Sequence, residues 1–237
     1  MSTHANMEKY ISSQVRYWET QKAKLEEPEK KNKRAYITIS REYGCSGFDV
    51  ATKIAEKLNE KNPEPSWAPY DKNIISSVMD DMGLSRNLEE TLTANAMKSL
   101  SGLLQNALGE LPPQVAVYRQ MAQTVGLLAL NGHSIIVGRA GRRITRNISG
   151  GFHVRLYAPH SWKVNTVMEK RSIDKKEAEA IVDSKTKLRD SYLKDFVHFD
   201  STDQNNYDLL INTASFSVDE IASLIIEAMN AKDLFEV

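Results

Sequence analysis

Short apolar runs alternate with longer amphipathic stretches along most of this chain. The short runs are rich in β-branched and aromatic residues and predict strands over 36–40, 66–70, 133–137, 153–158 and 208–212. Apolar residues at spacings of three and four predict helices over 48–60, 71–82, 112–129, 160–171, 174–195 and 218–231, and more loosely over 85–109. Strands and helices that alternate in this way form right-handed βαβ units. The pattern therefore predicts an α/β fold, a three-layer sandwich with a central five-stranded parallel sheet.

The first 34 residues follow a different pattern. Residues 5–27 predict an amphipathic helix with Trp18 on its apolar face, and the charged, proline-containing stretch 26–34 predicts a linker. We therefore expect an N-terminal helical arm and linker over 1–34, followed by one α/β domain over 35–237. The apolar face of the arm needs a partner surface, either on the main domain or on a second copy in a homodimer.

The composition narrows the possible partners and the compartment. The chain carries 31 basic and 31 acidic residues, a balance that argues against a general nucleic-acid binder. No stretch approaches the roughly 18 apolar residues of a membrane span, and the first 35 residues are polar and charged. Cys45 is the single cysteine, and the five histidines lack zinc-ligand spacing. We expect a cytoplasmic protein without a membrane partner, a disulfide or a structural zinc.

The loop after the first predicted strand is the clearest candidate for chemistry. Residues 41–47 read REYGCSG and lead into a predicted helix. The backbone of Gly44, Cys45, Ser46 and Gly47, with the free N–H groups of the helix start, can hold phosphate. An ordinary strand-to-helix turn is the alternative. The full Walker pattern G-x-x-x-x-G-K-[ST] is absent, because no lysine follows the second glycine.

The residues of this loop and several later segments resemble one known family. The string ITISREYGCSGFDVATKIAEKL over 37–58 is similar to the opening of the cytidylate-kinase-like proteins, whose S-R-x-Y-G-S-G-G loop also lacks the Walker lysine. Similar segments follow in the family's order: YDK at 70–72, IIVGR at 135–139, RLYAP at 155–159, RDSY at 189–192 and YDLLINT at 207–213. The resemblance covers about residues 36–230. It implies a P-loop-type nucleotide kinase with a helical acceptor-site insert over about 72–131 and a lid over about 172–196.

Two arginines are the candidate catalytic residues. Arg41 stands beside the loop glycines, where a guanidinium can bind phosphate oxygens in place of the lysine; an ion pair with Glu42 or Asp49 is the alternative. Arg189 lies in the expected lid, on one helix face with Lys185 and Tyr192, and can meet the charge of the transferred group. An exposed charged face is the alternative. Lys53 is a poorer substitute, because its neighbours face the core.

Further residues are candidates for nucleotide or phosphate binding. Arg139 follows the third strand, Asp71 follows the second, and Arg171 and Lys187 belong to the lid helices. Asp71 can instead cap a helix. The weaker candidates are Arg142, Arg143 and Arg146 after the third strand, Asp208 and Asn212 at the last strand, and Cys45 as a nucleophile.

Three functional hypotheses remain open on the sequence. The first is a nucleoside monophosphate kinase that transfers phosphate from ATP to CMP or a related acceptor, with Mg²⁺ arriving on the nucleotide as the resemblance implies. The second is a nucleotide-binding module without transfer, which the missing lysine favours. The third is a kinase for a different small molecule.

Overall fold

A computed structural model describes residues 34–62, 66–80, 100–102, 104–105 and 116–234. The predicted arm over 5–27, its linker up to residue 33, and most of the predicted helix over 85–109 lie outside these residues. Within the described part of the chain, no helix is long and apolar enough to cross a membrane.

The core of the protein is a sheet of five parallel strands, as the sequence predicted. The strands are β1 (Tyr36–Arg41), β2 (Ala68–Tyr70), β3 (Ser134–Val137), β4 (Gly151–Tyr157) and β5 (Leu209–Asn212). Their order in the sheet is β2-β3-β1-β4-β5. β4 begins two residues before its predicted start because Gly151 pairs with Tyr36 at the beginning of β1. The central strand β1 thus directs its carboxyl end, and the loop that follows, to the middle of one sheet edge.

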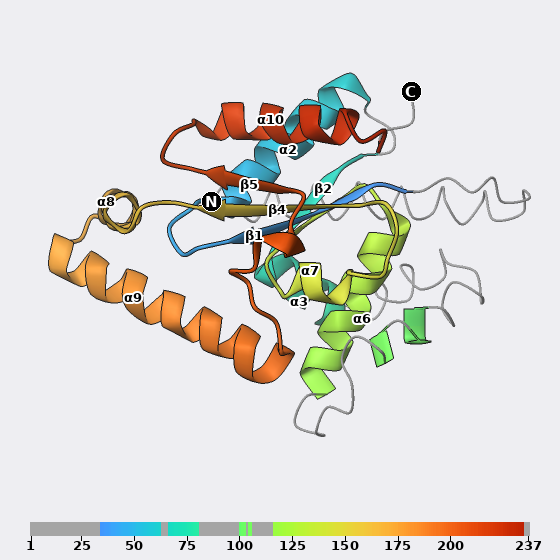
Figure 1. Cartoon of the computed structure of the whole chain (residues 1–237), viewed down its shortest axis with the longest axis horizontal. Coiled ribbons are helices and arrows are strands. Elements are labelled where there is room, and N and C mark those ends of the chain that lie inside the picture. Colours follow the sequence, from blue (N-terminus) through green and yellow to red (C-terminus); the bar gives the residue numbers. More distant parts are fainter. Residues whose placement is uncertain (1–33, 63–65, 81–99, 103, 106–115, 235–237) are drawn as a thin grey trace, which may run out of the picture.

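Helices cover both faces of the sheet and complete the three predicted layers. α2 (Gly47–Lys61) and α10 (Val218–Asn230) lie on one face, while α3 (Lys72–Asp80), α6 (Ala116–Asn131) and α7 (Gly141–Ile144) lie on the other (Figure 1). The alternation of side chains along β1 explains this arrangement. Ile37 and Ile39 are buried with α2 and α10, whereas Tyr36 is buried with α6.

A pair of helices lies beyond the carboxyl ends of the strands and is called the lid below. α8 (His160–Arg171) and α9 (Lys175–Ser191) form it, and the side chain of Asp174 caps α9 by accepting from the Glu177 N–H. A π-helical turn, Tyr192–Phe196, and a 3-10 turn, Gln204–Asn206, follow α9 and lead to β5. Figure 1 shows α9 standing apart from the sheet. The lid has its own small core of buried residues: Val164, Val167, Ala178 and Val182.

Candidate functional site

The loop between β1 and α2 presents an open helix start at the carboxyl edge of the sheet. Ser46 precedes α2 with φ +46° and its side chain makes no capping hydrogen bond. The first N–H groups of a helix have no partner within the helix, and the helix dipole places positive potential there. Gly44 has φ +97°, and a Cβ at this position would lie 3.1 Å from Cβ of Lys163. The loop therefore has the shape of an anion site.

The left-handed conformation of Ser46 should be measurable as strain. The left-handed conformation costs a non-glycine residue about 1–2 kcal/mol. Glycine avoids this cost, but it loses more conformational entropy on folding, which offsets part of the gain. We expect Ser46→Gly to raise the free energy of unfolding by roughly 0.5–1 kcal/mol in urea denaturation. The matched control is Ser223→Gly inside α10, which should lower it by about 0.5 kcal/mol. A loss of stability in Ser46→Gly would show that the loop is not strained there.

The side chain of Arg41 is packed between the start of α2 and the end of β3. A Cβ at Gly47 would lie 3.1 Å from Cγ of Arg41, and a Cβ at Gly138 would overlap Nη1 of Arg41. Gly138 has φ +74°, which also favours glycine. Arg41 therefore fills the space that a side chain at the first position of α2 would need.

Three arginines come together around this loop. Arg189 from α9 donates from Nη1 to the carbonyl oxygen of Arg41 at 3.4 Å. Burial, followed by the charges of Arg189 and Arg139, lowers the pKa of Arg41 to about 10, which leaves it charged at neutral pH. Among the described residues, no carboxylate lies within 4 Å of the three guanidinium groups. Asp71 is the carboxylate whose charge acts on Arg41, and it makes no direct ion pair with it. The cluster of Arg41, Arg139 and Arg189 thus offers positive charge to an anionic ligand.

Arg139 belongs to a strained turn. Gly138, Arg139 and Ala140 have φ values of +74°, +53° and +53° in succession. Left-handed non-glycine residues cost free energy and tend to occur at functional sites, where the surrounding structure holds them. The turn places Arg139 beside Arg41 instead of continuing β3.

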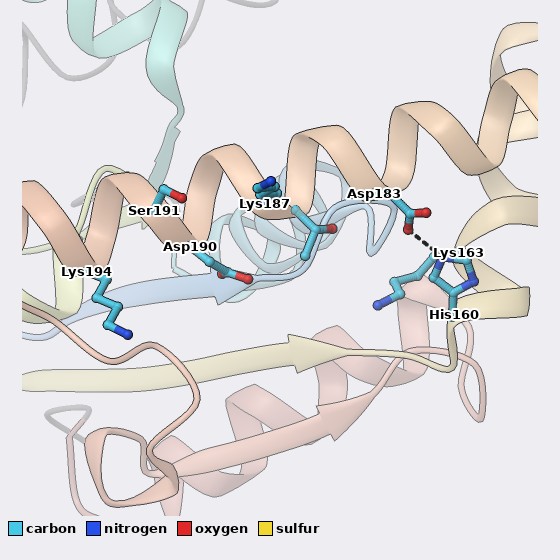
Figure 2. Close-up of a pocket in the computed structure, with 8 residues that line it drawn as sticks. His160, Lys163, Asp183, Lys187, Asp190, Ser191 and Lys194 are labelled. Atoms are coloured by element: carbon cyan, nitrogen blue, oxygen red, sulfur yellow. Dashed lines mark hydrogen bonds and ion pairs between the residues drawn. The ribbon is translucent and has the colours of Figure 1, made fainter.

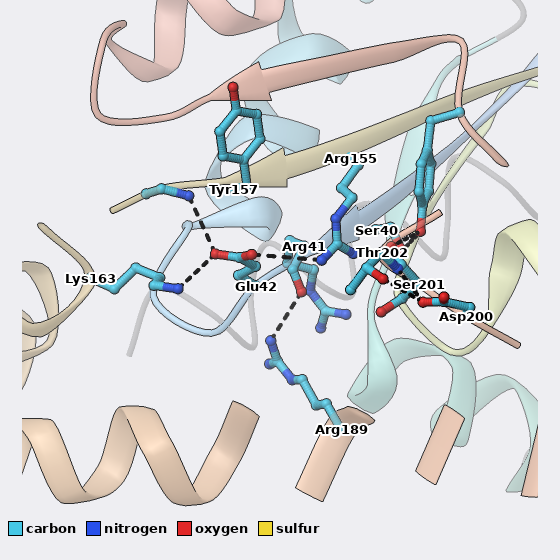
Figure 3. A network of polar contacts seen from close by, with 12 residues as sticks. Ser40, Arg41, Glu42, Arg155, Tyr157, Lys163, Arg189, Asp200, Ser201 and Thr202 are labelled. Carbon is cyan, nitrogen blue, oxygen red and sulfur yellow. Dashed lines mark hydrogen bonds and ion pairs between the residues drawn. The ribbon is translucent and has the colours of Figure 1, made fainter. Parts of the chain in front are cut away.

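A buried ionic network lies against the other side of the loop (Figure 3). Glu42 accepts from Nζ of Lys163 at 2.7 Å through Oε2, and its Oε1 lies 3.6 Å from Nη2 of Arg155. Both cations are only 8% exposed. The Arg155 guanidinium lies 5.8 Å from the ring centre of Tyr207, whose hydroxyl donates to the carbonyl oxygen of Ser201 at 2.9 Å. Glu42 therefore holds two buried cations directly beneath the loop.

The lid contacts the loop through several side chains. Lys170 donates to Oγ of Ser46 at 2.8 Å and to Oδ2 of Asp49 at 2.6 Å. Arg171 donates from Nη2 to the hydroxyl of Tyr43 at 3.0 Å. The residues of the lid that reach the loop are thus Lys163, Lys170, Arg171 and Arg189.

One cleft adjoins the loop, and a second lies in the lid. One, of about 430 Å³, is lined by Cys45 and Ser46, by Trp162 of α8, and by Phe216 and Thr213 after β5. The other, of about 600 Å³, lies between α8 and α9 and is lined by His160, Lys163, Asp183, Thr186, Lys187, Asp190, Ser191 and Lys194 (Figure 2). A hydrogen bond of 2.8 Å joins Nε2 of His160 to Oδ1 of Asp183 at its wall. The first cleft is partly aromatic, and the second is predominantly polar.

Other predicted residues have local roles or lie elsewhere. Asp71 caps α3, since its Oδ1 accepts from the N–H groups of Asn73 at 2.8 Å and Ile74 at 3.0 Å. Lys53 pairs with Glu56 at 2.7 Å on the outer side of α2. Lys187 lines the polar cleft, and Lys185 is exposed.

The weaker candidates also make local contacts or lie away from the loop. Arg142 donates to the carbonyl oxygen of Asn206, while the Arg143 Nη1 is buried without a partner among the described residues. Asp208 precedes β5, at the edge opposite the loop, where it pairs with Lys232 at 2.6 Å. Asn212 ends β5 and accepts from the Ala214 N–H at 3.1 Å. Burial raises the pKa of the Cys45 thiol, which disfavours a nucleophilic thiolate.

The buried network and the contact of Tyr43 with the lid were not predictable from the sequence. Glu42 was considered only as a partner of Arg41, and Lys163 and Arg155 were not singled out. Arg155 stands between the apolar residues Val154 and Leu156 of β4, and this position inside a buried strand was the one available signal. The partners of Glu42 lie more than 100 residues away, so only the fold reveals them.

Comparison with known proteins agrees with this fold. A model of the cytidylate kinase-like family matches residues 36–215. A crystal structure of an uncharacterised protein from Eubacterium ventriosum is 21% identical and superposes with a TM-score of 0.65, covering 84% of this chain and 99% of that one. A uronate isomerase of Corynebacterium glutamicum is 25% identical over 165 residues, which are 68% of this chain and 32% of that protein. The chain thus spans about a third of the length of that relative, whose activity is not carried over.

Proposed function

The chain belongs to the cytidylate kinase-like family, and we propose that it is a phosphotransferase that moves the terminal phosphoryl group of ATP to CMP or a related small acceptor. The observation that carries this proposal is the cluster of Arg41, Arg139 and Arg189 around the open start of α2, where no described carboxylate lies within 4 Å of a guanidinium group. Ligands of parallel α/β sheets bind at this edge, beyond the carboxyl ends of the strands.

The donor nucleotide fits on the β1–β4–β5 side of the site. Its phosphates would bind to the backbone N–H groups of the loop and to Arg41. Its base would enter the cleft between α8 and the loop after β5, where Trp162 and Phe216 offer aromatic faces. The acceptor would lie on the other side, over β2 and β3, with its phosphate on Arg139.

Transfer in this site depends on positioning and charge neutralisation. An oxygen of the acceptor phosphate attacks the γ-phosphorus of ATP, the bond from that phosphorus to the bridging β–γ oxygen breaks, and ADP leaves. Arg41 would stabilise the charge that develops on the β–γ side. Arg189 would reach the transferred group from the lid.

The family implies Mg²⁺ with ATP, and the residues near the loop fit a metal held mainly by phosphate. The oxygens that would hold it at the start of α2 are the hydroxyl of Ser46 and the carboxylate of Asp49, both of which accept hydrogen bonds from Lys170. Mg²⁺ usually keeps several waters and is bound through one or two protein oxygens and the substrate phosphates. When bound, the metal neutralises charge on the β- and γ-phosphates.

The proposal is tested by measuring ADP release with ATP and a panel of nucleoside monophosphates and other small acceptors. We expect acceptor-dependent turnover, with CMP or a close relative preferred. Binding of ATP without transfer to any acceptor would favour the second candidate, a nucleotide-binding or regulatory protein. One observation supports that candidate: Gly47 and Phe48 at the start of α2 provide neither the lysine nor the metal-binding hydroxyl of the Walker pattern.

The placement of the donor base gives a separate prediction. Loss of an aromatic stacking partner costs about 1–3 kcal/mol per base. We therefore expect Trp162→Ala to weaken ATP binding by roughly tenfold in calorimetry, with little change in kcat at saturating ATP. Leu224→Ala removes an exposed apolar side chain of α10 away from the cleft and is the control. Unchanged ATP affinity in Trp162→Ala would place the base elsewhere.

A further inference from the structure

We propose that Tyr43 is a positioning residue, which fixes the lid to the phosphate loop and aims Arg189 at the bound phosphates. The inference rests on the proposed function and assigns a role to the tip of its phosphate loop. It is carried by three kinds of contact that the Tyr43 side chain makes with the lid: apolar packing, a hydrogen bond and a cation–π contact.

The apolar contact shows that the lid core includes a residue of the loop. Val164 and Val167 of α8 and Ala178 and Val182 of α9 are buried against one another, and the half-buried Tyr43 packs on them. This cluster is separate from the two cores on the faces of the sheet. Among the described residues, the lid core thus includes a side chain of the phosphate loop and none from the sheet.

The backbone on either side of Tyr43 is held as well. Gly44 approaches Lys163 so closely that a Cβ on this glycine would lie 3.1 Å from Cβ and 3.3 Å from the carbonyl oxygen of Lys163. Glu42 binds the ammonium group of the same lysine at 2.7 Å. Tyr43 thus projects into the lid from a loop whose neighbouring residues are also fixed to α8.

The two polar contacts of Tyr43 orient arginines of the lid. Arg171 donates to its hydroxyl at 3.0 Å, and the Arg189 guanidinium lies 5.1 Å from the centre of its ring. A carboxylate in the place of the ring would neutralise Arg189. An aromatic face holds a guanidinium more weakly and leaves its N–H groups free to bind oxygen. One of these N–H groups, on Nη1, donates to the Arg41 carbonyl oxygen at 3.4 Å. This hydrogen bond keeps Arg189 at the phosphate site.

A double-mutant cycle tests this role. The four proteins are the full chain, Tyr43→Leu, Arg189→Ala and the double variant, with kcat and KM for ATP measured for each. Loss of a cation–π contact predicts that Tyr43→Leu lowers kcat by about tenfold when Arg189 is present. With Arg189 replaced by alanine, the same change should alter kcat less than twofold, because Tyr43 acts through Arg189. Equal losses in both backgrounds would overturn the proposal.

Two further measurements separate this role from a general structural one. Tyr43→Phe keeps the ring and removes only the hydrogen bond from Arg171, so its kcat should stay within about threefold of the unsubstituted protein, well above that of Tyr43→Leu. If Tyr43→Phe lost as much activity as Tyr43→Leu, the aromatic ring would not be the positioning element. The free energy of unfolding of each variant, from urea denaturation, identifies losses that come from instability alone.

The cycle remains informative if the protein transfers no phosphoryl group. Inorganic tripolyphosphate, titrated calorimetrically into the same four proteins, then serves as the probe of the loop and Arg189. We expect Tyr43→Leu to weaken its binding about tenfold with Arg189 present and less than twofold without it. That result, in a protein without turnover, would remove the proposed enzyme and keep the positioning role. Additive losses, or no loss with Arg189 present, would remove the positioning role itself.

Discussion

Arg41→Ala is expected to lower the turnover of phosphoryl transfer by about 10²–10³, equivalent to roughly 3–4 kcal/mol, while the fold remains intact. Arg41 stands where the loop lacks a lysine, with its aliphatic carbons against Gly47 and its guanidinium against Gly138. No described carboxylate lies within 4 Å of that guanidinium. A preorganised cation of this kind acts on the charge that shifts during transfer and needs no rearrangement at that moment. The measurement is kcat at saturating ATP and acceptor.

Two variants make this result specific. Arg41→Lys should recover only part of the turnover, because an ammonium group cannot reproduce the planar two-pronged contact of a guanidinium. Lys53→Ala should leave turnover unchanged, since Lys53 pairs with Glu56 on the outer face of α2. If Arg41→Ala keeps turnover within about threefold, a factor worth well under 1.4 kcal/mol, then Arg41 does not replace the Walker lysine.

The sheet could be predicted from the sequence because its strands are short, apolar and separated by amphipathic helices. Residues 37–39 and 135–137 are almost fully buried, so their composition is dictated by the core. The predicted ends of the strands are less accurate where pairing with a neighbouring strand sets them. Arg41 is the last residue of β1, not the first of the loop, because it pairs with Leu156 of β4. Its polarity alone does not reveal that partner.

The candidate site was only partly predictable, since its contacts join distant segments. Arg41, Arg139 and Arg189 could be singled out because each follows a strand or lies in a recognisable motif. Lys163 and Lys187 look alike in the sequence, because both are lysines on predicted helices. Both line the same cleft, but Lys163 is buried where α8 approaches Gly44, whereas Lys187 is exposed. Asp208 is a candidate on the sequence alone, but it precedes the first residue of β5 and therefore lies at the amino end of that strand, at the sheet edge opposite the loop.

The second large effect is expected on stability, from Glu42→Gln. The substitution removes the carboxylate that pairs with both Lys163 and Arg155, whose side chains are each 10% exposed, and keeps the size of the side chain. Breaking a buried ion pair from one side typically costs 3–5 kcal/mol, because the remaining charge stays buried and uncompensated. The Glu42 side chain is itself 25% exposed, so we expect a loss near the lower end, about 3 kcal/mol.

Urea denaturation with an unchanged m value measures this loss. Asp49→Asn is the matched control: it also removes a carboxylate from a lysine near the loop, but both partners of the Asp49–Lys170 pair are more than half exposed, at 51% and 55%. Exposed pairs contribute at most about 1 kcal/mol. Adding Lys163→Met to Glu42→Gln should restore part of the stability, because it replaces an uncompensated buried cation with an apolar side chain. If Glu42→Gln lost no more stability than Asp49→Asn, water would be screening the network, and Glu42 would not be what holds the two cations beneath the loop.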